Sequence, residues 1–244
     1  MTEVLFESPG DGVARIVINR PHARNAMSIV VRQGIAHALA RADADPRTLA
    51  IILTASGDEA FCASLDVKEL RNNPQAVRDA VSQDPRFNTA LAVASCSKPV
   101  IGAINGACIS GGLEVALACD ILVASDRARF ADFHVRVGHL PAWGLSQRLS
   151  RLIGPARARE MSFTGAFIDA DTAEKWGLVN RVVPHDRLQD EAVALALTIA
   201  AHDLRTLRAT KELMANGYAM PLADALDFER RLCAEFLAQT AQET

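Results

Sequence analysis

Residues 98–120 read KPVIGAINGACISGGLEVALACD, and this stretch decides how the rest of the chain is interpreted. The short, β-branched apolar run Val100–Ile104 predicts a buried strand, which ends at the turn residues Asn105-Gly106. Residues 113–119 follow and predict a helix that is buried on most sides. A strand, a glycine-rich corner and a helix therefore succeed one another within a single short stretch.

The corner at Gly111-Gly112 and the carboxylate of Glu114 give this stretch its chemical interest. The first N–H groups of a helix have no helical carbonyl to bind, and the positive end of the helix dipole lies there. These features suit a developing negative charge, and a carboxylate one turn further on suits proton transfer. The alternative is a corner of small residues that serves close packing, with Glu114 solvated at the helix surface.

The composition excludes several classes of protein. The chain has 244 residues, of which 50% are hydrophobic and 23% are charged, enough for a sizeable core in one large domain or a domain with an appendage. A formal net charge of -3 gives no basic footprint for nucleic acid and no polybasic patch for a membrane surface. No apolar run is long enough to span a bilayer, and the N-terminal residues lack a signal-peptide pattern. We therefore expect a cytoplasmic protein.

The five cysteines are odd in number and form no CxxC pair. This pattern is typical of reduced, buried thiols in a cytosolic protein. Cys62 has no histidine or basic residue beside it in the sequence, which favours a packing role over a nucleophilic one. Histidine, cysteine and carboxylate residues nowhere have the spacing of a metal site, so we expect no metal.

Strands and helices alternate along most of the chain, which predicts stacked βα layers. Residues 4–7 and Val13–Ile18 predict a β-hairpin, and Ser28 is the expected N-cap of a helix that reaches about Ala42. The further elements expected in order are a strand at 49–53, a loop of small residues at 60–65, a short helix at 66–71, a mobile loop within 72–97 that leads into a helix at about 86–95, strands at 121–124 and 128–131, helices at 155–162 and 171–176, and a strand at 178–183.

From residue 187 onward the pattern is entirely helical, with apolar stripes at 192–199 and 223–237. Such stripes must pack against the body of the protein or against another subunit. We therefore divide the chain into a core, residues 1–186, and a C-terminal helical oligomerisation region, residues 187–244, and predict self-association.

Several groups of residues occur in an order and at a spacing that together identify a family. They are Arg20-Pro21 with Arg24-Asn25-Ala26-Met27; Ala60-Phe61-Cys62-Ala63-Ser64-Leu65-Asp66; Lys98-Pro99-Val100 with Asn105-Gly106, Gly111-Gly112-Leu113-Glu114 and Cys119-Asp120; Phe130-Ala131-Asp132 with Gly138, Pro141, Gly144 and Arg148-Leu149; and Gly154, Ala170-Asp171-Ala173, Gly177-Leu178-Val179 and Ala209-Thr210-Lys211. On these residues the chain resembles the crotonase superfamily, the enoyl-CoA hydratase/isomerase group, over nearly its whole length. Phosphate-binding GxGxxG and GxxxxGK[ST] motifs and the GxSxG nucleophile elbow are absent from the sequence.

The resemblance implies an α/β fold, a spiral of repeated ββα turns followed by a helical trimerisation region, assembled as a homotrimer or hexamer. It implies an acyl-CoA thioester as the substrate, with no further cofactor. It also implies two backbone N–H groups that hold the thioester oxygen, and matched position by position these donors are Leu65 and Gly111. Such donors stabilise an enolate-like oxygen anion more than a neutral carbonyl.

The chain departs from the family pattern at two positions. Related hydratases place glycine where Ser64 stands, and a positive φ there would make serine cost about 1–2 kcal/mol. They also pair two glutamates on one water; the first matches Glu114, and His134 stands where the second is expected. One glutamate and one histidine can share the proton transfers of hydration. Alternatively His134 is only an anchor and Glu114 moves the proton alone, as is typical of double-bond isomerases in this family.

The resemblance also places other side chains at the acyl-CoA site. Arg24, Lys68 and Lys211 are candidates for contacts with CoA phosphates, the alternative being ordinary solvated cations. Asp66 is expected to cap the helix that follows it, and Trp143 to shape the acyl pocket or else fill the core. The implied substrate-binding set is Arg24, Ala26, Ala63, Asp66, Val67, Lys68, Gly112, Pro141, Trp143 and Lys211.

Two kinds of function follow from these residues. The first is an acyl-CoA enzyme that hydrates a double bond or shifts it, with Glu114 as general acid and base. The second is a non-catalytic acyl-CoA-binding protein that kept the fold and lost part of the site. The role of His134 separates them.

Overall fold

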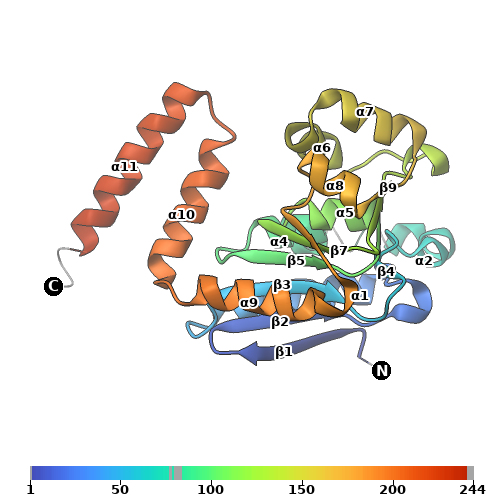
Figure 1. Cartoon of the computed structure of the whole chain (residues 1–244), viewed down its shortest axis with the longest axis horizontal. Helices are drawn as coiled ribbons and strands as arrows, with labels where there is room; N and C mark the ends of the chain where they lie inside the picture. The colour runs from blue at the N-terminus through green and yellow to red at the C-terminus, as the bar shows by residue number, and fades with distance from the viewer. Residues whose placement is uncertain (1, 77–78, 80–83, 241–244) are drawn as a thin grey trace.

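The computed structural model describes residues 2–76, 79 and 84–240. Within these residues the strands of a larger sheet are β1 (Val4–Gly10), β2 (Val13–Ile18), β3 (Ala50–Ala55), β5 (Val100–Ile104), β7 (Ile121–Ser125) and β10 (Arg181–Val183), hydrogen-bonded in that order. A smaller sheet contains β4 (Ala60–Cys62), β6 (Ala107–Ile109), β8 (Arg129–Ala131) and β9 (Ile168–Asp169), also in that order. After β3, β5 and β7 the chain passes each time into the smaller sheet, which is the expected spiral (Figure 1).

The helices of the described residues are α1 (Ile29–Ala44), α2 (Val67–Asn72), α4 (Thr89–Ala94), α5 (Gly111–Ala116), α6 (Leu145–Ile153), α7 (Pro155–Thr164), α8 (Ala170–Trp176), α9 (Leu188–Ala200), α10 (Leu204–Gly217) and α11 (Leu222–Thr240). Ser28 caps α1 as predicted, because its hydroxyl accepts the N–H of Val31 at 3.2 Å. None of these helices has the length and apolar character that crossing a membrane requires.

Several local predictions were wrong. The loop predicted at 60–65 contains β4, and β6 was not predicted at all. The helix expected at 113–119 is α5, which begins earlier, at Gly111. A strand of three residues is too short to show a two-residue hydrophobic period, so only its pairing in the sheet reveals it. The helix α6 was also missed.

The predicted mobile loop falls partly on residues 77–78 and 80–83, which lie outside the described residues.

The parallel strands of the larger sheet are buried on both faces. In β3, Ile51 and Leu53 enter the main core cluster, whereas Ala50 and Ile52 face a second cluster. Successive side chains of a strand point to opposite faces, and burial on both faces is typical of parallel sheets. This explains why the strands read as continuous apolar runs rather than alternating ones.

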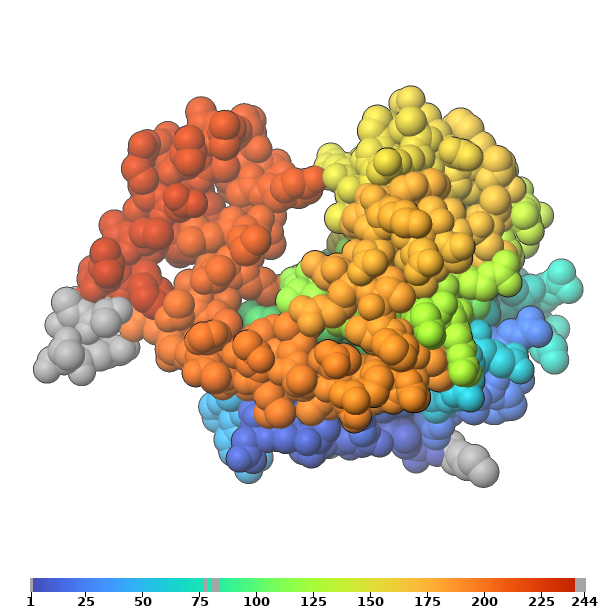
Figure 2. All heavy atoms as spheres, in the orientation of Figure 1, coloured from blue at the N-terminus to red at the C-terminus, as the bar shows by residue number. Residues whose placement is uncertain are grey.

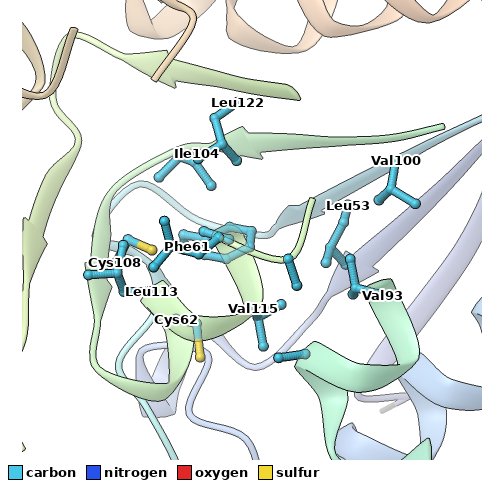
Figure 3. Packing of buried hydrophobic residues seen from close by; sticks show 14 of the residues in the cluster. Leu53, Phe61, Cys62, Val93, Val100, Ile104, Cys108, Leu113, Val115 and Leu122 are labelled. Carbon is cyan, nitrogen blue, oxygen red and sulfur yellow. The ribbon is translucent and has the colours of Figure 1, made fainter. Parts of the chain in front are cut away.

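Part of the main core cluster lies where the smaller sheet meets α5. Figure 3 shows Phe61 at its centre, with Cys62 on the same strand and Leu113 and Val115 from α5 around it. These residues have exposed fractions of zero. The packing fixes α5 against β4, and with it the corner that precedes the helix.

The last three helices differ in what they cover. Leu188, Ala192 and Ala196 of α9 are buried in the second cluster, so α9 packs on the larger sheet. The helices α10 and α11 extend away from it as a pair (Figure 1), and in Figure 2 the turn between them reaches the α6 region, where Tyr218 and Ala219 line a cavity together with α6 residues. Lys211 ties α10 to the body, donating to Asp120 Oδ2 at 2.6 Å and to the Lys98 carbonyl at 2.9 Å.

Two glycines allow backbone segments to touch. A Cβ on Gly112 would lie 2.3 Å from the carbonyl oxygen of Cys62, and one on Gly106 would lie 2.6 Å from that of Glu59. Neither glycine has a positive φ, so the requirement is for space and not for an unusual conformation. The corner can therefore approach β4 only because these side chains are missing.

Replacing Gly112 with alanine should destabilise the protein by about 1–3 kcal/mol, because the new methyl group would overlap a backbone oxygen of β4. A backbone atom in a sheet cannot move aside as a flexible side chain can. Chemical denaturation of the purified variant measures the difference.

The matched control is Gly217→Ala in α10, where the added Cβ meets only the Ala225 methyl at an ordinary 3.7 Å. Alanine favours a helix over glycine, so this variant should be at least as stable as the wild type. Equal stability of Gly112→Ala and the wild type would contradict the packing described for the corner.

Candidate active site

The loop after β3 is held by amide side chains from two other parts of the chain. Asn25 Nδ2 donates to the carbonyl oxygens of Ser56 and Ala60 at 2.9 and 2.7 Å. Asn105 Nδ2 donates to the Gly57 carbonyl oxygen at 2.6 Å. The asparagines of the sequence motifs therefore act on backbone, and they set the position of the loop that leads to residue 65.

Asp66 closes this loop and caps α2, as predicted. Its carboxylate accepts the N–H groups of Lys68 and Glu69 at 2.9 and 3.1 Å, and Arg20 Nη1 binds it at 2.6 Å. Burial disfavours the charged form, but the N–H of Glu69 and the Arg20 guanidinium outweigh it, so the pKa of Asp66 lies below its usual value. Asp66 thus serves to position the loop.

The N–H of Leu65 points out of this loop and has no acceptor among the residues that the structure describes. Met27 pairs with Leu65 as an isolated parallel bridge. In this bridge Met27 N–H donates to the Ser64 carbonyl, and Asp66 N–H donates to the Met27 carbonyl, at 2.9 and 3.1 Å. The N–H of Leu65 lies on the opposite edge and donates to none of the described residues. The expected first donor is therefore available.

The N–H of Gly111, the expected second donor, is already engaged. It donates to Ser64 Oγ at 3.1 Å. Ser64 has φ +84°, so its position requires the conformation that glycine adopts most easily. Both donors that the resemblance implies therefore adjoin Ser64, the first as its neighbour in sequence and the second through its hydroxyl.

Glu114 is buried with an exposed fraction of 3%, so the alternative of a solvated carboxylate is wrong. Its Oε1 accepts the backbone N–H groups of Trp143 and Leu145 at 2.6 and 3.3 Å, which leaves Oε2 unoccupied by backbone donors. Burial raises the pKa of Glu114, and the two N–H groups oppose this only in part. A carboxyl group with a raised pKa can both accept and return a proton.

His134 faces the free oxygen of Glu114. Its Nε2 lies 3.9 Å from Glu114 Oε2, and its Nδ1 lies 2.6 Å from Asp132 Oδ1. Asp132 also accepts the backbone N–H of His134 at 3.1 Å. Burial alone would raise the pKa of Asp132, but the hydrogen bonds from His134 and Ser162 lower it below the usual value. An anionic Asp132 keeps the proton on Nδ1, so Nε2 is the atom that can exchange one with Glu114.

Sequence reasoning missed Asp132 and Arg32 as parts of this region. Asp132 belonged to a family motif, and the signal was its position two residues before His134. Arg32 is buried at 1% exposure, with Nε donating to the Phe87 carbonyl at 2.8 Å and the guanidinium 5.4 Å from the centre of the Trp143 ring. No sequence pattern indicated this contact, because it joins α1 to a loop more than a hundred positions away.

The three cations predicted to bind CoA phosphates do not lie together in the structure. Arg24 is exposed and lies 3.4 Å from Glu59, and Lys68 and Val67 are exposed at the start of α2. Lys211 is engaged with Asp120 at the base of α10. The small residues Ala26 and Ala63 lie in the two loops that meet beside residue 65, and Pro141 is half-buried before α6.

The structure thus brings together the donor loop, Glu114, His134 and the backbone of Trp143. A cavity of about 290 Å³ adjoins Trp143 and is lined by Asn88, Leu91, Ala142, Trp143, Gly144, Gln147 and Arg148. Burial raises the pKa of Cys62 to about 12, so this thiol is inert at neutral pH. The described residues contain no cluster of histidine, cysteine and carboxylate groups suited to a metal ion.

Known proteins share the sequence pattern and the fold of this chain. The model of the enoyl-CoA hydratase/isomerase family matches residues 9–244. The probable enoyl-CoA hydratase echA8 of Mycobacterium bovis is 40% identical over 230 residues, which cover 94% of this chain and 88% of that protein. A short-chain-enoyl-CoA hydratase of Clostridium acetobutylicum is 33% identical over 245 residues, covering 100% and 92%. The crystal structure of an enoyl-CoA hydratase from Bacillus anthracis has a TM-score of 0.90 at 34% identity, covering 95% of this chain and 90% of that one.

The melting temperature of Glu114→Gln relative to that of the wild type should be higher at pH 8 than at pH 4. A pKa raised by folding means that Glu114 stabilises the fold below its unfolded value of about 4.3, and that this contribution is lost as the pH rises through the folded value. Glutamine keeps the Oε1 acceptor for Trp143 but carries no charge. Melting temperatures of both proteins at the two pH values measure the effect.

Asp132→Asn is the matched control with the opposite sign. The pKa of Asp132 is lowered, so its charge stabilises the fold above the unfolded value of about 3.9 and ceases to do so in acid. This variant should therefore lose more stability at pH 8 than at pH 3. The same sign of change in both variants would contradict the charge states assigned to the two carboxyl groups.

Proposed function

The chain belongs to the enoyl-CoA hydratase/isomerase family, and from this membership we propose that it adds water to the double bond of a 2-enoyl-CoA thioester. The observation that carries the proposal is the buried carboxylate of Glu114, whose Oε2 is free of backbone donors and faces His134 Nε2 at 3.9 Å. Glu114 lies in α5, whose first residue, Gly111, donates its N–H to Ser64 Oγ of the donor loop. The named hydratases among its relatives support the same reaction.

The oxygen of the thioester is held at the donor loop in this proposal. The thioester oxygen binds next to the N–H of Leu65, on the side where Gly111 and Ser64 lie. When water adds to the β-carbon, the electron pair of the double bond moves toward this oxygen and forms an enolate. Donors fixed in advance stabilise that anion more than the neutral thioester. Residues Ala26, Ala63 and Gly112 serve by allowing the two loops to approach this closely.

The water is bound between Glu114 Oε2 and His134 Nε2. Two acceptors or donors 3.9 Å apart can both bind one water at about 2.8 Å from each, with the water seated to one side of the line that joins them. One group removes a proton as the oxygen attacks the β-carbon, and a proton is then delivered to the α-carbon. Asp132 holds the imidazole in orientation throughout.

The proposed CoA contacts follow from exposure and charge. Lys68 follows the donor loop in sequence, and the carbonyl oxygen of Arg24 accepts the N–H of Ala63 in that loop at 3.1 Å. Both side chains are exposed cations, and a bidentate guanidinium suits a phosphate. Asp66 and Val67 at the start of α2 line the same rim. Lys211 serves first to tie α10 to Asp120. Trp143 and Pro141 border the acyl chain.

Purified protein should hydrate crotonyl-CoA, which is followed by loss of the conjugated thioester absorbance. Glu114→Ala should lower kcat/KM by at least about 100-fold, because a positioned acid–base group contributes about 10²–10⁴-fold. A 3-enoyl-CoA tests isomerisation in parallel. Binding of CoA thioesters with no turnover of either substrate above the Glu114→Ala background would favour the non-catalytic binding protein.

His134→Ala separates the two reactions. If the histidine shares the water, hydration is lost while any isomerisation by Glu114 persists. The conservative control is His134→Gln, which keeps a donor near Glu114 but cannot exchange a proton at neutral pH. Full hydratase activity in both variants would overturn the assignment of His134.

We also propose that α10 and α11 assemble the protein as a homotrimer or a hexamer. Four large apolar side chains on or beside these helices are at least two-thirds exposed: Met214, Tyr218, Leu222 and Leu237. A chain with that much exposed apolar surface is expected to cover it with another copy. Light scattering at micromolar concentration should give a multiple of three times 26.2 kDa, and a mass of one chain would contradict the proposal.

A further inference from the structure

Ser64 adopts a backbone conformation that serine avoids. Its φ of +84° lies in the region open mainly to glycine. The surrounding structure holds it there, because its carbonyl oxygen accepts the N–H of Met27 at 2.9 Å and Leu65 pairs with the same residue. Residues kept in such conformations cluster at functional sites, where the strain accompanies a chemical role.

The hydroxyl of Ser64 is a donor with no acceptor in the described part of the chain. Its Oγ accepts the N–H of Gly111 at 3.1 Å, which uses one lone pair. The hydroxyl proton is donated to none of the described residues, and the side chain is only partly buried. The O–H can therefore turn about the Cβ–Oγ bond toward a ligand that binds at Leu65.

We propose that the Ser64 hydroxyl is a further donor to the thioester oxygen, placed between the N–H of Gly111 and the substrate. This proposal rests on the hydratase function proposed above. Gly111 N–H polarises the hydroxyl that accepts from it, and a polarised O–H is a stronger donor to an anion. The oxygen then receives one hydrogen bond from Leu65 N–H and one from Ser64 O–H, and Gly111 acts through the serine.

The same geometry also allows the opposite role, in which Ser64 blocks the N–H of Gly111. Ser64 Oγ occupies the acceptor position of Gly111 N–H, so a serine that only blocked this donor would have to be displaced by the substrate. Displacing a neutral hydrogen bond costs little, so a blocking serine lowers affinity by less than about tenfold. The two roles predict opposite signs for removal of the hydroxyl.

The experiment uses the full chain with Ser64→Ala and Ser64→Gly. One oxyanion donor contributes about 10²–10³-fold to kcat, and the N–H of Gly111 that is set free recovers part of it. We therefore expect kcat/KM for crotonyl-CoA to fall by at least about tenfold in both variants. Ser64→Gly should at the same time melt about 2–4 °C higher than the wild type, since the strain is relieved. A more stable yet less active variant cannot be explained by misfolding.

A binding measurement separates this proposal from the proposed function. Butyryl-CoA has no double bond, so it occupies the site without turnover, and its carbonyl stretching frequency reports the hydrogen bonds to the thioester oxygen. The frequency should be lowered in the wild type and less so in Ser64→Ala. The control is Ser97→Ala, which removes a hydroxyl bonded to Asp43 at 2.7 Å, outside the site, and should leave frequency and turnover unchanged.

Each outcome decides one of the two proposals. Equal or higher kcat/KM in both Ser64 variants, with an unchanged carbonyl frequency, would overturn the role of Ser64 as a donor and leave the hydratase function standing. Failure of the wild type to bind butyryl-CoA would overturn the hydratase function instead. A fall in activity with the smaller frequency shift supports the donor role.

Discussion

The site depends on the contact between two backbone segments, the corner at Gly111-Gly112 and the loop that runs from Cys62 to Ser64. The absence of a Cβ on Gly112 brings the corner against the Cys62 carbonyl. The same approach places Gly111 N–H within hydrogen-bond distance of Ser64 Oγ. Because Phe61 and Leu113 are buried on either side of this contact, the hydrophobic core and the donor geometry are fixed by the same packing (Figure 3). The precision of the site is thus a consequence of core packing.

Two buried carboxyl groups near the candidate site show that burial and hydrogen bonding shift a pKa in opposite directions. Glu114 and Asp132 are both almost fully buried, yet the pKa of Glu114 is raised and that of Asp132 is lowered. The difference lies in their partners, since Glu114 has backbone donors on one oxygen alone, whereas Asp132 is bound by the ring and the backbone of His134. Two carboxyl groups whose environments move their pKa values apart are suited to different roles.

Much of this could be predicted from the sequence because it resides in local pattern or in motif order. The strand Val100–Ile104, the caps Ser28 and Asp66, and the ββα spiral were all predicted correctly. What could not be predicted rests on contacts between distant segments. The strands β4 and β6 exist through pairing, and the bond from Gly111 to Ser64 appears only when two loops meet. Sequence reasoning posed the question of a positive φ at residue 64, and only the backbone conformation answered it.

The two departures from the family pattern act at opposite ends of the proposed reaction. The proposals assign Ser64 to the oxygen that gains negative charge and His134 to the carbons that exchange water and a proton. Stronger stabilisation of the enolate oxygen lowers the basicity of the α-carbon, so the group that protonates this carbon must be a better acid. In the proposed reaction this group is Glu114 or His134, whose Oε2 and Nε2 atoms lie 3.9 Å apart. The matching of donor strength to acid strength is therefore a property of the pair of sites, and altering either residue alone changes the demand on the other.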